Sequence, residues 1–428
     1  MERGDSETVF DGRAERQRKK FRLKYLEEIR RETEAIRSRP DYFQELDYFV
    51  DLLESGPDPA AISARTGLPV AGLLCVQAPF ELVRAAGFHP FRICGGSAAA
   101  ARLSAPQLPP VMCPALRSIV GAALLEPAGG KGFALRIAPC TCDWTAKMPE
   151  LEGLVGSGGA PAFYRMDLPR LKDRDESQER WLGEVYALRR RLMEAAGGKR
   201  VGPPALSKAL AVYQGAWRAF SNLSGLRAKG HVASAVFAAV AASFFHDLPE
   251  TWTERLKRAL PLFKASAQDG LEVFLAGSPV FFPNFKLYRL LEEAGLRVAG
   301  DDLCSGERIF PGAVFCDDPS EHGLLKALAQ RYHQGCLCPV FAEDDRRANS
   351  VVAPALDGRH SGVVYHVLKG CHPYDLESIG LERRVKEAGM RFLRIETDYA
   401  EEDSQTLLTR LEAFRNSLVP ARRVASVG

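Results

Sequence analysis

The chain has 428 residues, 46% of them hydrophobic and 26% charged, with a formal net charge of +3 and ten cysteines. This length accommodates two domains with full cores, and the composition excludes a wholly disordered chain. Basic residues alternate with acidic ones and no apolar run reaches about 18 residues, so we expect no nucleic-acid partner, no membrane span and a cytoplasmic location.

Residues 1–65 are predicted to form a helical extension. Residues 13–38 are strongly charged, with apolar side chains near helical spacing, which predicts a surface helix. A second helix is predicted at 42–53, because Ser-Gly-Pro-Asp-Pro at 55–59 ends it. The basic cluster at 16–20 is typical of a solvated helix face, with contact to an acidic partner as the alternative.

From about residue 70, short apolar runs alternate with amphipathic segments, a pattern typical of parallel sheets covered on both faces. It predicts a first α/β domain over 66–204, a helical connecting region over 205–265 and a second α/β domain over 266–428. The expected strands lie at 88–94, 133–138, 273–276, 296–299, 362–368 and 391–396, and the expected helices at 81–86, 116–125, 175–196, 285–294, 322–332 and 376–388.

Three cysteines stand where a strand-like or apolar run gives way to a polar turn, the place where open α/β sheets bind ligands. They are Cys113, Cys142 and Cys371. Helix-forming residues follow Cys113 and Cys371, and Pro114 suits the first position of a helix. A helix N-terminus favours the thiolate, the form that binds metal or attacks a substrate. We therefore predict that the three thiols share one site.

Ten cysteines in a long chain without a secretion signal argue against a disulfide framework. Three distant thiols suit an iron–sulfur cluster with one open iron. Structural zinc usually takes paired ligands such as Cys-x2-Cys, which the chain lacks, so the spacing favours iron–sulfur over zinc without excluding zinc. The other thiols divide into ambiguous ones, namely Cys140, Cys304, Cys336 and Cys338, and two that read as inert core residues, Cys75 and Cys316.

Three further residues are candidates for positioning a hydroxyl or moving a proton. Ser118 stands on the predicted helix after Cys113, and His372 is next to Cys371. Glu81 is the third, with a capping or solvated role as the alternative. Because the chain contains no P-loop motif, we expect no ATP hydrolysis within it.

Several stretches between about 70 and 416 form an ordered series of motifs. They are 78–88 (Ala-Pro-Phe-Glu-Leu-Val-Arg-Ala-Ala-Gly-Phe), 112–118 (Met-Cys-Pro through Ser), 141–143 (Thr-Cys-Asp), 301–304 (Asp-Asp-Leu-Cys) with Arg308, 331–332 (Arg-Tyr), 338–339 (Cys-Pro), 362–371, and 395–399 (Ile-Glu-Thr-Asp-Tyr) with Gln405, Thr409, Arg410 and 412–414. In these residues the chain resembles the iron–sulfur subunits of 2-hydroxyacyl-CoA dehydratases. That family also includes benzoyl-CoA reductase subunits and double-cubane cluster proteins.

The resemblance implies two flavodoxin-like, doubly wound parallel-sheet domains with an intervening helical region. It also implies a [4Fe–4S] cluster held by Cys113, Cys142 and Cys371 in the cleft between them. In such enzymes the open iron meets the thioester carbonyl of an acyl-CoA, and a separate ATP-dependent iron–sulfur activator supplies one low-potential electron. The resulting ketyl radical anion expels the hydroxyl and makes the β-proton far easier to remove.

The resemblance is also compatible with two other functions. Lys-Gly-Cys-His-Pro-Tyr at 369–374 differs from the dehydratase form in its His and Pro and partly resembles the double-cubane branch. A double-cubane reductase of small molecules is therefore one alternative, with further cysteines as ligands. A non-catalytic structural subunit with a zinc-filled or empty site is the other. The resemblance also implies either a homologous second subunit or a homodimer.

Overall fold

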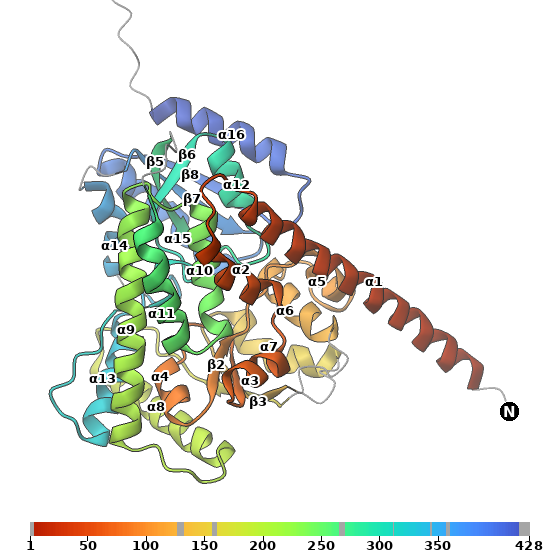
Figure 1. Cartoon of the computed structure of the whole chain (residues 1–428), viewed down its shortest axis with the longest axis vertical. Helices are drawn as coiled ribbons and strands as arrows, with labels where there is room; N and C mark the ends of the chain where they lie inside the picture. The colour runs from red at the N-terminus through yellow and green to blue at the C-terminus, as the bar shows by residue number, and fades with distance from the viewer. Residues whose placement is uncertain are drawn as a thin grey trace, which may run out of the picture.

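The computed structural model describes residues 4–125, 132–155, 161–264, 270–310, 312–342, 345–356 and 360–418. Two four-stranded parallel sheets covered by helices form the body of the molecule, and a long N-terminal helix crosses it and projects beyond it (Figure 1). The predicted α/β class with two flavodoxin-like domains is confirmed. Both ends of the chain, residues 1–3 and 419–428, lie outside the described residues.

The first sheet has the strand order β2–β1–β3–β4, and all its neighbouring strands are parallel. Every residue of the central strand β1 is buried, as expected for a parallel sheet with both faces covered. The strands are β1 (Val70–Leu73), β2 (His89–Arg92), β3 (Phe133–Pro139) and β4 (Phe163–Met166), and the helices between them are α4 (Phe80–Ala85), α5 (Ala98–Ser104), α6 (Pro114–Leu125) and α7 (Asp143–Val155).

The second sheet repeats this order as β6–β5–β7–β8, again all parallel. Its central strand β7 is buried along its whole length. The strands are β5 (Leu271–Gly277), β6 (Leu296–Asp301), β7 (Gly362–Leu368) and β8 (Arg391–Thr397), and the helices are α12 (Lys286–Glu293), α13 (Glu321–Gln334), α14 (Asp345–Leu356), α15 (His372–Glu387) and α16 (Ser404–Leu418).

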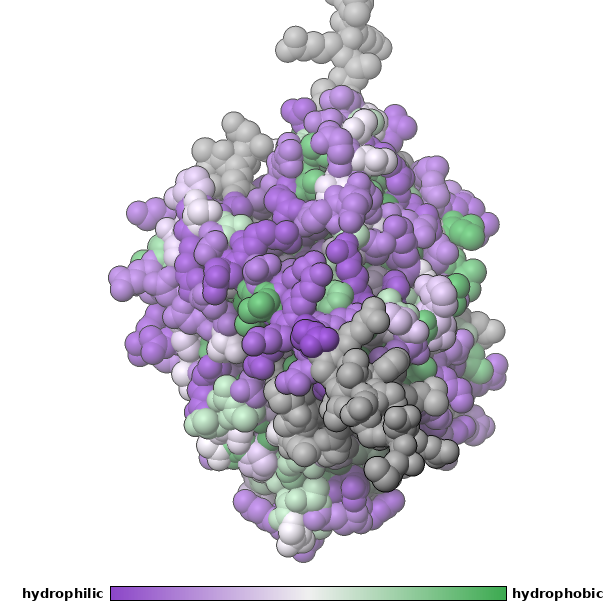
Figure 2. Space-filling model, turned by 90° about the vertical axis from the view of Figure 1, so that its right-hand side faces the viewer, coloured by the Kyte–Doolittle hydropathy of each residue, from purple (hydrophilic) through white to green (hydrophobic). Residues whose placement is uncertain are grey.

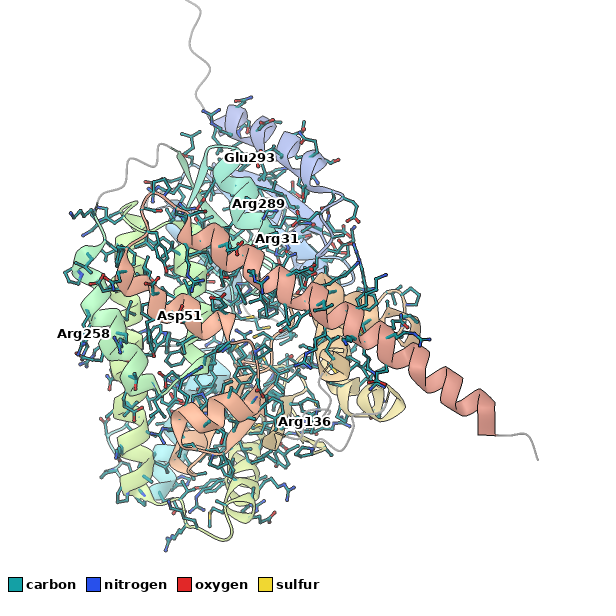
Figure 3. The ribbon with its side chains drawn as sticks, turned by 45° about the vertical axis from the view of Figure 1, so that its right-hand side comes forward. Arg31, Asp51, Arg136, Arg258, Arg289 and Glu293 are labelled. Carbon is teal, nitrogen blue, oxygen red and sulfur yellow. The ribbon has the colours of Figure 1, made fainter. Side chains whose placement is uncertain are left out.

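The remaining helices connect the two halves. They are α1 (Gly4–Arg37), α2 (Asp47–Glu54), α3 (Pro59–Thr66), α8 (Asp175–Ala195), α9 (Pro203–Ala228), α10 (Ser234–Ser243) and α11 (Pro249–Ala259). Helix α1 packs against α5 of the first half, and its Arg31 reaches Glu401 of the second half at 3.3 Å. Arg289 of α12 contacts the same carboxylate at 2.9 Å, and Figure 3 shows the two arginines close together. One glutamate therefore links α1 and α12.

Seven of the α-helices and strands in the described residues were not predicted from the sequence, namely β1, β4, α3, α5, α7, α14 and α16. Strand β4 has only four residues, too few to show a period. Helix α5 begins with four alanines and lacks the contrast of an amphipathic helix, while α7 contains Pro149, which argues against a helix in sequence. Tertiary packing determines the secondary structure of these segments.

Apolar side chains gather inside the molecule. Figure 2 shows one face, on which hydrophilic residues predominate and apolar ones are scattered. No helix in the described ranges is both long and apolar enough to cross a membrane.

A buried ion pair joins α9 to the end of β6. The Arg227 guanidinium lies 2.6 Å from Asp301 and 2.5 Å from Glu307, and neither the arginine nor Asp301 has an exposed side-chain atom. Arg227 also stacks 3.6 Å from the centre of the Phe237 ring. Its removal would leave a buried carboxylate without its countercharge.

We predict that Arg227→Met lowers the free energy of unfolding by about 3–5 kcal/mol, measured by urea denaturation. The matched control is Arg258→Met, since Arg258 lies on the surface of α11 and pairs with Glu254 at 3.3 Å (Figure 3). The control should change stability by less than about 0.5 kcal/mol. Equal effects of the two substitutions would contradict the importance of the buried pair.

Candidate thiol site between the two sheets

Cysteines follow the carboxyl ends of the strands in both sheets. In the first sheet Cys75 follows β1, Cys94 follows β2, and Cys140 and Cys142 follow β3; in the second, Cys304 follows β6 and Cys371 follows β7. Because carboxyl ends of parallel strands gather at one edge of a sheet, each half presents its thiols along one edge. Contacts between the two sets of loops bring these edges together, as the following geometry shows.

The three predicted ligands meet at this junction. Cys371 lies within electrostatic reach of both Cys113 and Cys142, and Cys113 within reach of Cys142. Cys113 belongs to an apolar cluster against which Cys371 packs. The structure thus brings together three thiols from separate loops, which we call the first thiol group.

A close backbone approach fixes the distance between two of these loops. Gly370 has a left-handed conformation, with φ of 74°. A Cβ atom there would lie 2.2 Å from the carbonyl oxygen of Val111 and 3.4 Å from the nitrogen of Cys113. Only glycine combines this φ with this contact at low cost, so Gly370 lets the Cys371 loop lie directly against the Cys113 loop.

The helix N-termini act on the thiols as predicted, but burial outweighs them. Backbone N–H groups of the first turn of α6 donate to Cys113, and that of Tyr374 in α15 donates to Cys371. Burial, together with the neighbouring thiols, nevertheless raises the pKa of Cys113 to about 11 and that of Cys371 to about 12. In the protein alone, burial therefore has a larger effect on these two pKa values than the helix N-termini have.

A second thiol group lies beside the first. Burial raises the pKa of Cys75 and Cys94 to about 11, that of Cys336 to about 12 and that of Cys338 well above its usual value, and electrostatic contacts link these four thiols with one another and with Cys304. Cys75 also interacts with Cys142, so the two groups adjoin. We call this set of five, Cys75, Cys94, Cys304, Cys336 and Cys338, the second thiol group.

Two buried arginines face the second thiol group. The Arg92 guanidinium donates to the sulfur of Cys304 at 3.2 Å and to its carbonyl oxygen. Arg308 donates to the carbonyl oxygen of Leu337 between the last two cysteines and, at 2.8 Å, to the hydroxyl of Tyr374. Their positive charges favour negative charge on the thiols around them.

The sequence missed Cys75 and Cys94 as members of this group. Cys75 was interpreted as an inert core thiol because apolar residues surround it in the chain. A usable signal was present, since each of the two directly follows a strand end. Cys316 packs against the edge of the main apolar core, and its thiol, on a half-buried loop, donates to the carbonyl oxygen of Asp318 at 2.9 Å.

The recorded contacts of Cys140 lie outside both groups. Its sulfur approaches the carbonyl oxygen of Ala138 at 3.9 Å and interacts with Arg165 on β4. Of the two cysteines separated by Thr141, it is Cys142 that faces the other thiols.

The three predicted proton-handling residues lie in different surroundings. Ser118 is buried, and its hydroxyl accepts a hydrogen bond from the backbone of Ser97 at 3.0 Å. Glu81 is also buried, pairs with Arg331 and accepts from the Tyr332 hydroxyl at 2.9 Å, so it bridges α4 and α13. His372 is exposed at the start of α15. Their catalytic roles stay predictions.

Two cavities border the second thiol group. One of about 70 Å³ is lined by Cys94, Arg92 and the side chains of Phe91 and Phe281, and reaches α1 at Tyr25. The other, of about 290 Å³, is lined by Cys336 and Arg308, together with Asp302, Tyr332 and Gln77. Cys113, Cys142 and Cys371 line neither of these two cavities; Cys113 is buried, and Cys142 and Cys371 are half-buried.

The donor chemistry of the first thiol group fits an iron–sulfur cluster. Its three cysteines are free thiols on three loops, and Ser278 forms a hydrogen bond with Cys371. Within the described ranges, no three Cys, His, Asp or Glu side chains gather closely enough to hold a metal ion. A cubane cluster binds its thiolates at separate corners, so its ligands stand farther apart than those of one ion.

Comparisons with known proteins likewise indicate a family of dehydratase subunits. A family model described as "2-hydroxyglutaryl-CoA dehydratase, D-component" matches residues 75–418. The putative dehydratase subunit YjiM of Escherichia coli (strain K12) is 26% identical over 361 residues, covering 81% of this chain and 91% of that protein. The (R)-phenyllactyl-CoA dehydratase beta subunit of Clostridium sporogenes is 21% identical, covering 83% and 93%. The lactoyl-CoA dehydratase subunit beta of Anaerotignum propionicum is 23% identical, covering 82% and 92%.

We predict that Gly370→Ala destabilises the protein more than Gly389→Ala, measured by urea denaturation. Both glycines have a positive φ, but a Cβ at Gly389 would meet nothing within 4 Å. Gly389→Ala should therefore cost only the left-handed strain of about 1–2 kcal/mol. Gly370→Ala should cost about 1–3 kcal/mol more, because the loops must move apart. Equal losses of stability in the two variants would show that the Gly370 loop can move away from Val111 at no energetic cost.

Proposed function

Because the chain belongs to the family of the 2-hydroxyglutaryl-CoA dehydratase D-component, we propose that it is the iron–sulfur subunit of a 2-hydroxyacyl-CoA dehydratase-like enzyme. In this proposal Cys113, Cys142 and Cys371 hold a [4Fe–4S] cluster. The substrate is an acyl-CoA, which undergoes radical dehydration or reduction. The observation that carries the proposal is the meeting of these three thiols between the sheets.

A [4Fe–4S] cluster on three protein thiolates supplies one iron with a free coordination position and a one-electron redox couple. The protein's own groups have definite tasks around it. Backbone N–H groups at the start of α6 and α15 donate to Cys113 and Cys371 and favour negative charge there. Chemistry on a reactive radical requires that water be kept out, and the buried Cys113 with the apolar side chains around it would contribute to that.

The partners in this proposal follow from the relatives. Two of them are named as beta subunits of dehydratases, and a third as a dehydratase subunit. We propose that this chain likewise works with a homologous second subunit or with a second copy of itself. A separate ATP-dependent iron–sulfur activator is proposed as the electron source, as the resemblance to the family implies.

We predict that anaerobically purified protein contains about four iron and four sulfide per chain. Single Cys113→Ala, Cys142→Ala and Cys371→Ala variants should lose most of this iron and the visible absorbance of the cluster. Cys140→Ala is the matched control, since Cys140 lies two residues from Cys142 but points toward Ala138. Loss of iron in Cys140→Ala with retention in Cys142→Ala would overturn the ligand assignment.

A second candidate function is reduction of small molecules at a double-cubane cluster. The specific observation in its favour is that the second thiol group adjoins the first through Cys75 and Cys142. Arg92 and Arg308 would balance the added negative charge of a second cubane. The 70 Å³ cavity at Cys94 would suit a substrate of a few heavy atoms better than an acyl-CoA.

Iron and sulfide counts distinguish the two candidates. A double cubane predicts about eight iron atoms per chain, and replacement of Cys336 and Cys338 together by Ser should remove about half of them. A single [4Fe–4S] centre predicts about four iron atoms and no change in the same double variant. A count of four that survives the double substitution would exclude the double cubane.

A further inference from the structure

Tyr399 joins the two halves of the molecule at the thiol site. It follows β8 of the second sheet and is only 5% exposed. Its hydroxyl donates to the carbonyl oxygen of Gly95, which follows β2 of the first sheet, at 2.6 Å. Residues 304 positions apart in sequence are thus joined by one hydrogen bond.

The ring of Tyr399 lies among the thiols. It packs in the same apolar cluster as Met112, Cys113 and Leu368, with Cys371 against the edge of that cluster. Its acceptor Gly95 directly follows Cys94, a member of the second thiol group. Burial raises the pKa of Tyr399 well above its usual value, and the nearby Cys113, Cys94 and Cys371 raise it further. The phenol therefore stands between the two thiol groups.

The segment that accepts the hydrogen bond is held at backbone distance from its neighbours. A Cβ on Gly95 would lie 2.3 Å from the carbonyl oxygen of Ala115 in α6. A Cβ on Gly96 would lie 2.3 Å from that of Phe281 in the second half. The two glycines let the segment pass between α6 and the 281–282 turn, with no side chain to separate them.

A buried ammonium group fixes the turn that carries Tyr399. Lys286 of α12 donates to the hydroxyl of Thr397 at 2.9 Å and to the carboxylate of Asp403 at 2.7 Å. It also donates to the carbonyl oxygens of Asp398 and Ala400, at 3.0 and 2.5 Å. These bonds surround position 399 on both sides, so the tyrosine is presented by a preorganised turn.

A second hydrogen bond anchors the main chain of the same residue. The Asn284 side-chain amide donates to the carbonyl oxygen of Tyr399 at 3.1 Å. Asn284 stands directly after the 281–283 turn that lies against Gly96. The turn that carries Tyr399 and the turn that touches the first half are therefore joined to each other.

We propose that Tyr399 is a positioning residue that holds the two halves closed over the first thiol group, through its hydrogen bond to Gly95. Without this bond the two halves separate more often at their junction, and Cys113 and Cys371 are exposed to solvent more often. The proposal rests on the proposed function for its part in catalysis. The reactivity of the thiols themselves does not depend on iron, so the two proposals can fail separately.

The test measures alkylation of individual cysteines in the full-length, metal-free, reduced chain. Tyr399→Phe keeps the ring and removes the hydroxyl. We expect maleimide labelling of Cys113 and Cys371, followed by peptide mass spectrometry, to become roughly fivefold faster, the effect of losing one buried hydrogen bond on an opening equilibrium. Cys316, on a partly exposed loop of the second half, should react at the same rate in both proteins.

Tyr48→Phe is the matched control, because that hydroxyl donates to Asp247 at 2.8 Å away from the thiols. It should leave the labelling of Cys113 and Cys371 unchanged. Asn284→Ala removes the hydrogen bond that anchors the turn without altering Tyr399. It should also accelerate the labelling of Cys113 and Cys371, and it serves as the test if Tyr399→Phe fails to fold. Unchanged labelling in both site variants, or equal acceleration in Tyr48→Phe, would overturn the proposal.

Discussion

The two parallel sheets meet with their carboxyl ends together, and this meeting is the constraint on which the thiol site depends. A parallel sheet presents its functional loops along one edge, so one sheet alone surrounds a ligand from one side. Here the second sheet closes the other side, with Gly370 against the backbone of Val111. Cys113 and Cys371 are distant in sequence, and this backbone contact, together with the Tyr399–Gly95 hydrogen bond and the approach of Gly96 to Phe281, brings them together.

The electrostatic balance of the junction depends on what the thiols bind. The two adjoining groups contain eight sulfurs, and burial disfavours the charged forms of Cys113, Cys371 and Cys336 among others. Helix N-termini, Ser278 and the guanidinium groups of Arg92 and Arg308 supply partial or full positive charge nearby. These groups are placed where they would stabilise a negatively charged inorganic centre.

The sequence predicts most strands because their apolar runs are bounded by turn residues, as at 362–368 and 391–396. It also places Cys371 before a helix, since a strand, a glycine and a proline mark that turn. It does not reveal that Cys75 faces Cys142, because a cysteine amid apolar residues has the same local pattern whether it lies in a core or at a site. Glu81 shows the same limit, since its partner Arg331 is 250 residues away.

The equal strand order of the two sheets has one more consequence. Cys142 and Cys371 both come after the third strand of their own sheet, so they occupy matching places in two similarly wound units. Cys113 has no such counterpart, because it belongs to the crossover between the second and third strands. Two members of the first thiol group are thus related by the repeated strand order, and the third is not. A fold made of two similar halves therefore supplies a set of thiols that lacks twofold symmetry.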